Sequence, residues 1–195
     1  MRRVASVLGT EVDFERRLVG TVEGMASTVD HLKGLQCRVV LTSGSFDLIH
    51  LGHVKYLARA KEFGDVLVVG VDSDAKIKRR KGDDRPMVPQ AERLEMLAYQ
   101  RPVDLIYLKD EDESKWGLIR AVRPDVLVLT EDHSYSEADQ VALLEICGRI
   151  EIVPRQSSIT TSERIRQMYM HMGERLGPKL AEVLPGLIDA VLRRG

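Results

Sequence analysis

The sequence has few cysteines, no long apolar run and almost no net charge. Its two cysteines, Cys37 and Cys147, have no metal-ligand spacing and are too few for a disulfide framework. No apolar run approaches the roughly 20 residues of a membrane-spanning helix, so we expect no membrane partner. The formal net charge of −1 at pH 7 creates no overall field for nucleic acid, and we expect no nucleic-acid partner.

The N-terminal residues and the cysteines together favour a cytoplasmic protein. Two arginines follow Met1, but Glu11, Asp13 and Glu15 interrupt the residues after them, so no apolar signal segment forms. Both cysteines lie beside apolar residues, which is typical of reduced thiols in a reducing compartment. A hydrophobic content of 44% over 195 residues is enough for one domain with a substantial core.

Apolar runs of strand length alternate with helical patterns along the middle of the chain. We expect strands at residues 38–41, 65–71, 104–108, 126–129 and 150–153, and helices at 54–63, 91–99, 116–122 and 138–147. This alternation predicts an α/β fold, a doubly wound, Rossmann-like parallel sheet of about five strands with helices on both faces. Ligands of such open sheets bind beyond the carboxyl ends of the strands.

Both ends of the chain lie outside this alternation. Residues 1–36 fit no βα unit and are interpreted as an N-terminal extension to a domain over residues 37–166. Residues 167–195 predict a helical C-terminal extension, interrupted near Gly177–Pro178 and again at Pro185. An apolar stripe on this extension requires a covering surface, from its own core, a second subunit or another protein. The stripe comprises Leu180, Val183, Leu184, Leu187, Ile188 and Val191.

The segment from Ser43 to His53 places glycines and histidines between an expected strand and an expected helix. Such a turn directs backbone N–H groups and the positive end of a helix at one point, which suits a phosphate. Gly44 and Gly52 allow close backbone approach. His50 and His53 would stabilise charge on a phosphoryl group as imidazolium ions. The alternatives are local hydrogen bonds or a zinc site, and zinc is disfavoured because no further ligand has suitable spacing.

A run of hydroxyl residues follows the last expected strand. Thr160, Thr161 and Ser162 lie where the next helix is expected to begin, and ordinary N-capping would explain them. In a doubly wound sheet, however, this helix begins at the same edge as the helix after the first strand. The two helix starts would then face one polyphosphate.

One dense basic run follows the second expected strand, over residues 76–81, and further basic residues extend to Arg93. We interpret this run as a solvated loop that leads into the helix at residue 91, because charge runs are usually exposed. Its position near the carboxyl edge of the sheet suggests that some of its cations clamp an anionic substrate.

These segments together resemble a known family. Residues Gly44 to His53 match the signature Gly-x-Phe-Asp-x-x-His-x-Gly-His in full, and Arg155 to Ser162 resemble a second signature, Arg-x-x-x-Ile-Ser-Thr-Thr. On these motifs the chain is similar to the cytidylyltransferase-like nucleotidyltransferases of the HIGH superfamily. Residues 74–93 look most like the adenylyltransferase domain of ADP-heptose synthase. Residues 154–162 look more like glycerol-3-phosphate and phosphoethanolamine cytidylyltransferases.

The resemblance implies transfer of a nucleoside monophosphate from an NTP to a phosphate oxygen, with release of pyrophosphate. It implies catalytic roles for His50, His53, Lys81 and Arg155. It also implies Mg²⁺ bound mainly through the nucleotide phosphates, so we expect no metal cage made of protein ligands. The residues that the resemblance assigns to nucleotide binding are Gly44, Ser45, Phe46, Asp47, Gly52, Lys55, Arg93, Thr160, Thr161 and Ser162.

The nucleotide and the acceptor stay open at this point. Residues Thr130 to Ser134 lack the glycines and the lysine that the heptose enzymes carry there. We favour ATP and a phosphorylated sugar such as a heptose 1-phosphate. The alternative is CTP with glycerol 3-phosphate or another alcohol phosphate or phosphonate, and a non-enzyme alternative is a nucleotide-binding regulatory protein. A homodimer is expected from the resemblance and the apolar C-terminal stripe.

Overall fold

The computed structural model describes residues 14–154, 156 and 161–192, without the side chains of residues 161, 162 and 186–192. The chain divides into two compact units, Met1–Ser157 and Ser158–Gly195. The first unit contains the whole sheet, and the second contains helix α9 (Thr161–Leu192). The domain boundaries expected at residues 36 and 166 stay a prediction.

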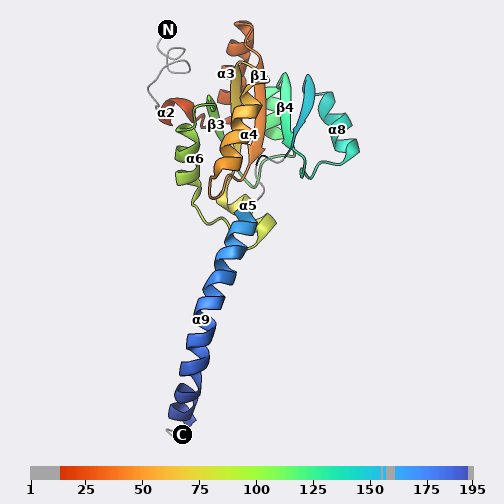
Figure 1. The fold of residues 1–195 in the computed structure, drawn as a ribbon. Coiled ribbons are helices and arrows are strands. Elements are labelled where there is room, and N and C mark those ends of the chain that lie inside the picture. Colours follow the sequence, from red (N-terminus) through yellow and green to blue (C-terminus); the bar gives the residue numbers. More distant parts are fainter. Residues whose placement is uncertain (1–13, 155, 157–160, 193–195) are drawn as a thin grey trace. The chain divides into compact units, whose positions relative to one another are not determined.

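Five parallel strands form the sheet of the first unit in the order β3-β2-β1-β4-β5 (Figure 1). The strands are β1 (Val39–Gly44), β2 (Val66–Asp72), β3 (Leu105–Lys109), β4 (Val126–Thr130) and β5 (Arg149–Val153). This arrangement confirms the predicted α/β fold. The chain runs from β1 to β2 on one side and returns to β4 on the other, so the topological switch point lies between β1 and β4. Ligands of such sheets bind at this point.

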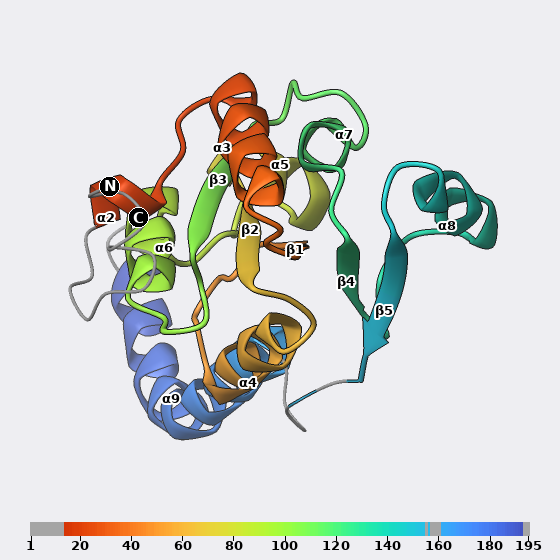
Figure 2. The same cartoon turned by 90° about the horizontal axis from the view of Figure 1, so that it is seen from above.

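Helices cover both faces of the sheet (Figure 2). One apolar cluster joins α4 and α6 to one face, and a second joins α3, α7 and α8 to the other. The bounds are α3 (Val22–Gly34), α4 (Leu51–Lys61), α6 (Gln90–Ala98), α7 (Gly117–Val122) and α8 (Glu137–Leu144). All seven residues of β2 are buried, as its continuous apolar run predicts for a central strand covered on both faces.

The N-terminal segment contributes to the core of the first unit. Helix α2 (Phe14–Arg17) precedes a bridge between Leu18 and Ile106 of β3. Met25 and Val29 of α3 have no exposed surface and pack in the cluster that also contains residues of α7 and α8. The described residues of the expected N-terminal extension therefore bury apolar surface with the sheet, although they precede β1, the first strand of the sheet.

The basic run after β2 is a helix, and our prediction of a loop was wrong. Helix α5 (Asp74–Lys81) begins at Ser73, whose hydroxyl accepts a hydrogen bond from the Lys76 N–H at 3.2 Å. Ile77 has no exposed surface and anchors the helix to the unit. Because four basic side chains occupy the last turn, they lie at the negative end of the helix dipole, where cations are favourable.

Helix α9 is continuous from Thr161 to Leu192, so the predicted interruptions were wrong. Pro178 and Pro185 both lie inside it. Each proline removes one backbone donor and costs about 3 kcal/mol in a helix interior, yet the helical turns on either side continue. Leu180, Val183 and Leu184 of the expected stripe are exposed. Among the described residues, we find no helix with the length and apolarity needed to span a bilayer.

Candidate active site

The turn between β1 and α4 has a strained backbone. Phe46 and Leu48 have φ angles of 49° and 51°, in the left-handed region that non-glycine residues rarely adopt. Gly44 lies against the Phe46 ring, because a Cβ added at Gly44 would be 3.2 Å from Phe46 Cε2. Phe46 is 4% exposed and packs in the cluster on the α4 face. Its burial holds the turn in this conformation, and such strain is common at functional sites.

The two histidines cap the start of α4 reciprocally. His50 is the N-cap residue, and its Nδ1 accepts a hydrogen bond from the Gly52 N–H at 3.0 Å. His53 Nδ1 accepts from the His50 N–H at 3.4 Å. The ring centroids lie 4.1 Å apart. Because each Nδ1 accepts a hydrogen bond, the proton of each neutral ring is carried on Nε2.

The surroundings of His53 favour its neutral form. Burial, followed by the neighbouring His50 and Lys81, lowers the pKa of His53 from 6.5 to about 4, and Asp47 only partly opposes this shift. At neutral pH its Nε2–H is therefore a hydrogen-bond donor without a full positive charge. The imidazolium ion expected from the sequence is not the form that this environment favours in the free protein.

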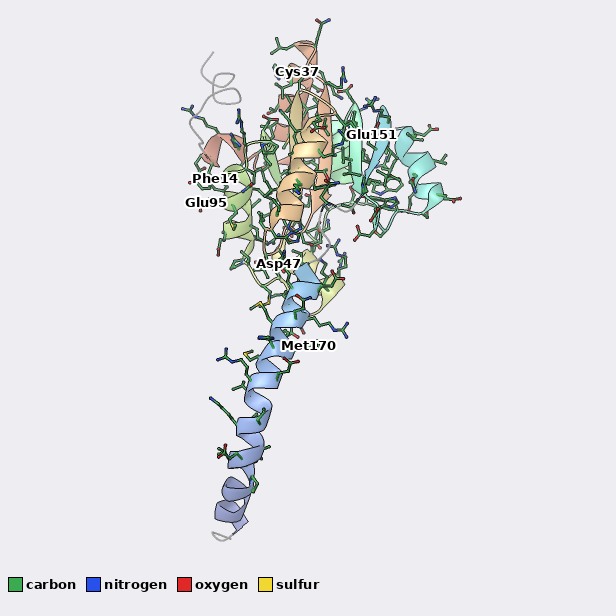
Figure 3. All side chains as sticks on the ribbon, in the orientation of Figure 1. Phe14, Cys37, Asp47, Glu95, Glu151 and Met170 are labelled. Carbon is green, nitrogen blue, oxygen red and sulfur yellow. The ribbon has the colours of Figure 1, made fainter. Side chains whose placement is uncertain are left out.

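Asp47, which is labelled in Figure 3, connects the signature turn to the segment before α6. Its carboxylate accepts hydrogen bonds from the Met87 N–H at 3.0 Å and from the Val88 N–H at 3.0 Å. It also forms an ion pair with Arg85 at 2.8 Å, and Asp47 is only 3% exposed. The buried carboxylate therefore orients the turn, and the nucleotide contact that the resemblance implies for Asp47 stays a prediction.

Arg93 is fully buried against the same turn. Its guanidinium donates to the carbonyl oxygens of Val88 and Asp72 at 2.9 Å, to the Ser45 carbonyl and to the Asp74 carboxylate at 2.7 Å. Arg93 has no exposed surface. These bonds join the ends of β1 and β2 to α6, so the guanidinium stabilises the site in the free protein. Its implied contact with the nucleotide stays a prediction.

Of the two predicted lysines, Lys81 is the one that the structure shows near the histidines. Lys81 ends α5 and is close enough to His53 to lower the pKa of that imidazole. Burial and the adjacent Arg80 and Arg85 lower the pKa of Lys81 itself. Lys55 lies in the first half of α4 and is exposed.

Most of the second family signature, Arg155 to Ser162, lies outside the described residues. Arg155 and Thr160 lie outside the described residues, as do the side chains of Thr161 and Ser162. Thr161 does begin a helix, α9, as expected for a capping segment, but this helix belongs to the second unit. The convergence of the two helix starts on one polyphosphate therefore stays a prediction.

A charged network at the end of β2 was not predicted from the sequence. Asp72 ends β2, is 2% exposed, and pairs with Arg80 at 2.9 Å and with Lys109 at 3.3 Å. Arg80 also donates to the Ser45 hydroxyl at 2.8 Å. Burial alone would raise the pKa of Asp72, but Lys109 and Arg80 lower it below its usual range. The available signal was a carboxylate at the carboxyl end of an otherwise apolar strand.

A cavity of about 410 Å³ opens on the α7 face of the same sheet edge. Its residues come from the ends of β1 and β3, from α5, from α7 and the segment before it, and from α8 and the segment before it. The lining combines basic, acidic and aromatic side chains. They include Lys76, Arg79, Lys109, Glu111, Glu113, Lys115, Trp116, Tyr135 and Asp139.

The comparison with known protein families identifies the family of this chain. The model of the family described as cytidylyltransferase-like matches residues 41–174, which include the signature turn, the cavity residues and the start of α9. The chain belongs to the cytidylyltransferase-like family. It is therefore a nucleotidyltransferase, as the resemblance of its two motifs predicted.

Curated relatives of this nucleotidyltransferase include two bifunctional HldE proteins. The protein from a Nitratiruptor species is 46% identical over 129 residues, covering 66% of this chain and 28% of the relative. The protein from Geobacter metallireducens is 36% identical over 157 residues, covering 80% of this chain and 32% of the relative. The chain thus spans less than a third of the length of these two relatives.

Two solved structures share the fold of the nucleotidyltransferase. A lipopolysaccharide core biosynthesis protein from Thermoplasma volcanium is 30% identical, with a TM-score of 0.54, and the match covers 61% of this chain and 98% of that one. Pantoate-beta-alanine ligase from Francisella tularensis has a TM-score of 0.52 at 17% identity, over 70% of this chain and 66% of the ligase. At that identity the second likeness supports the fold alone.

Proposed function

We propose that this chain transfers a nucleoside monophosphate, in the first place from ATP, to the phosphate of a phosphorylated sugar such as a heptose 1-phosphate. Family membership supports the transfer, and residues 74–93 support the adenylyl branch through their resemblance to ADP-heptose synthase. We further propose that it works in the cytoplasm as a homodimer. The single observation that carries the proposed chemistry is the capped pair His50 and His53 at the carboxyl edge of the sheet.

In the proposed reaction, an oxygen of the acceptor phosphate attacks the α-phosphorus of the NTP. The bond from the α-phosphorus to the oxygen that bridges to the β-phosphate breaks, and its electron pair leaves with pyrophosphate. The acceptor oxygen is already anionic, so no strong general base is required. Positioning and stabilisation of charge then supply the rate enhancement.

The histidines would act as paired donors to the α-phosphate. Reciprocal capping places the proton of each neutral ring on Nε2, so each would donate one hydrogen bond to a phosphoryl oxygen as charge develops there. Lys81 would supply a positive charge beside them. We assign Arg155, Thr160, Thr161 and Ser162 to the β- and γ-phosphates on motif position alone.

We propose that Mg²⁺ is carried to the site by the nucleotide. Among the described residues, no group of three or more His, Cys, Asp or Glu side chains is placed to hold a metal ion. The carboxylates nearest the turn, Asp47 and Asp72, are already paired with Arg85, Arg80 and Lys109. These residues do not form a magnesium cage. Bound through phosphate and water oxygens, the ion would neutralise negative charge on the triphosphate.

Pyrophosphate release tests the proposed function directly. The purified chain is incubated with Mg²⁺, each of four NTPs and a set of acceptors that includes a heptose 1-phosphate and glycerol 3-phosphate. Turnover with ATP and a sugar 1-phosphate is the expected result. Preference for CTP and glycerol 3-phosphate would instead support the cytidylyltransferase alternative. Binding of NTP without turnover on any acceptor would contradict the enzyme assignment and favour a regulatory protein.

A further inference from the structure

The network of Ser45, Arg80, Asp72 and Lys109 joins the signature turn to the cavity across the carboxyl edge of the sheet. Ser45 belongs to the turn, whereas Lys109 lines the cavity on the opposite face. Building on the proposed function, we propose that Asp72 is a positioning residue that holds Arg80 and Lys109 to bind the acceptor phosphate. The rest of the acceptor would lie in the cavity.

A glycine in β2 leaves space for the Lys109 side chain to lie across that strand. Asp72 and Lys109 are register partners in the parallel pair of β2 and β3, so their side chains are neighbours on one face. Gly70 precedes Asp72 by two residues on that face. A Cβ at Gly70 would lie 2.8 Å from Lys109 Cδ, 2.7 Å from Ser43 Oγ and 2.6 Å from Leu118 Cδ2. The missing side chain of Gly70 therefore makes room for the lysine stem.

The network retains positive charge and hydrogen-bond donors for an anion. Arg80 gives two hydrogen bonds through one guanidinium nitrogen, and its side chain is 54% exposed. A guanidinium has five N–H donors, so donors remain for a phosphate. Lys76 is near enough to Asp72 to influence the pKa of that carboxylate. Three cations thus lie around one buried carboxylate, and although Glu113 also acts on Lys76, the surplus of positive charge favours an anion.

The lining of the cavity indicates the class of the remaining acceptor. Glu111, Glu113 and Asp139 bring carboxylates that disfavour a second anionic group but accept hydrogen bonds from hydroxyl groups. Trp116 and Tyr135 provide aromatic surface for the apolar face of a sugar ring. This combination fits a singly phosphorylated, hydroxyl-rich compound. Its phosphate would lie at Arg80 and Lys109, next to the histidines that hold the α-phosphate.

Substitution of Asp72 distinguishes positioning from simple electrostatics, because the two effects have opposite signs. Asp72→Asn removes a negative charge, so electrostatics alone would strengthen the binding of phosphate. If Asp72 instead holds Arg80 and Lys109 in place, the same substitution weakens binding, because the two cations lose their fixed positions. The Asp104→Asn variant is a matched control, because Asp104 is a buried carboxylate that pairs with Lys61 at the other end of the sheet.

The experiment measures the KM for the best acceptor and for the NTP in wild type, Asp72→Asn, Arg80→Gln, Lys109→Gln and Asp104→Asn, with thermal melts for each. We expect the acceptor KM to rise at least tenfold in the first three variants, with the NTP KM changed less than threefold. We expect Asp72→Asn to add little to a variant that already carries both Arg80→Gln and Lys109→Gln, because it acts through those two cations. An unchanged or lower acceptor KM in Asp72→Asn, or an equal rise in Asp104→Asn, overturns the proposal.

A binding measurement separates this inference from the proposed function. Inorganic phosphate is titrated calorimetrically into each variant in the presence of a saturating α,β-methylene NTP analogue. Phosphate binding that weakens in the Arg80, Asp72 and Lys109 variants but not in Asp104→Asn supports the anion site even if no acceptor is turned over. Binding that is the same in all variants overturns the inference while leaving pyrophosphate release to decide the proposed function.

Discussion

At the residue scale, the histidine pair combines a structural and a chemical role in the same side chains. The Nδ1 atoms stabilise the start of α4, and this places the ring protons on Nε2. The histidine signature was visible in the sequence because its residues are contiguous. The reciprocal capping was not, because it depends on the extended backbone of His50, with φ −137° and ψ 173°.

Two substitutions of His50 separate these roles. His50→Ala removes both the cap and the donor, so we expect about 10²–10³-fold lower kcat together with about 1 kcal/mol lower stability. His50→Asn keeps an oxygen that can cap the Gly52 N–H, so its thermal midpoint should stay near wild type while kcat still falls. Steady-state pyrophosphate release and thermal melts measure both effects. Near-normal kcat in His50→Asn would show that the Nε2–H donor is not required.

The low pKa of His53 predicts a pH effect on stability. The folded pKa is about 4 and the unfolded value is 6.5. Between these values the unfolded chain binds a proton that the folded chain does not, so the free energy of unfolding falls as pH falls through this range. Relative to His53→Gln, we expect wild type to lose on the order of 2–3 kcal/mol between pH 7 and pH 4. Denaturant titrations at several pH values measure the difference, and parallel curves would contradict it.

At the scale of elements, the strands were predictable, but helix α5 and the continuity of helix α9 were not. β2 and β4 read as apolar runs of strand length because they are covered on both faces. α5 was mistaken for a loop because six of its eight residues are charged, and the burial of Ile77 alone fixes its inner face. The prolines of α9 predicted breaks because the free-energy cost of a proline inside a helix can be judged from the sequence. The sequence does not show that the helical backbone continues around them.

Helix α3 gives a test of the N-terminal segment. We expect Met25→Ala to lower the free energy of unfolding by about 2–5 kcal/mol, because Met25 has no exposed surface and its truncation leaves a cavity. The matched control is Asp30→Ala, further along the same helix on its exposed face. Urea titrations compare the two. Equal losses in both variants would mean that α3 contributes little to the core of the first unit.

At the scale of the whole molecule, the exposed apolar side chains of α9 require a covering surface. Leu180 and Val183 are 54% and 55% exposed, and residues of this kind usually meet a partner. If the stripe pairs two copies, light scattering at micromolar concentration should give twice the chain mass of 22.0 kDa. We expect Leu180→Lys with Val183→Lys to give a monomer. A wild-type monomer would contradict the proposed homodimer.

The sequence by itself determined the parallel sheet, the signature turn and the family. These features depend on the local spacing of apolar residues and on motifs whose residues are contiguous in the sequence. Only the tertiary structure decided that Arg93 is buried, that Asp47 fastens residues 85–88 to the turn, and that Asp72 joins Arg80 to Lys109. Such contacts join residues 8 to 48 positions apart in the sequence. Strand order and packing determine which of these residues meet, and the local sequence does not.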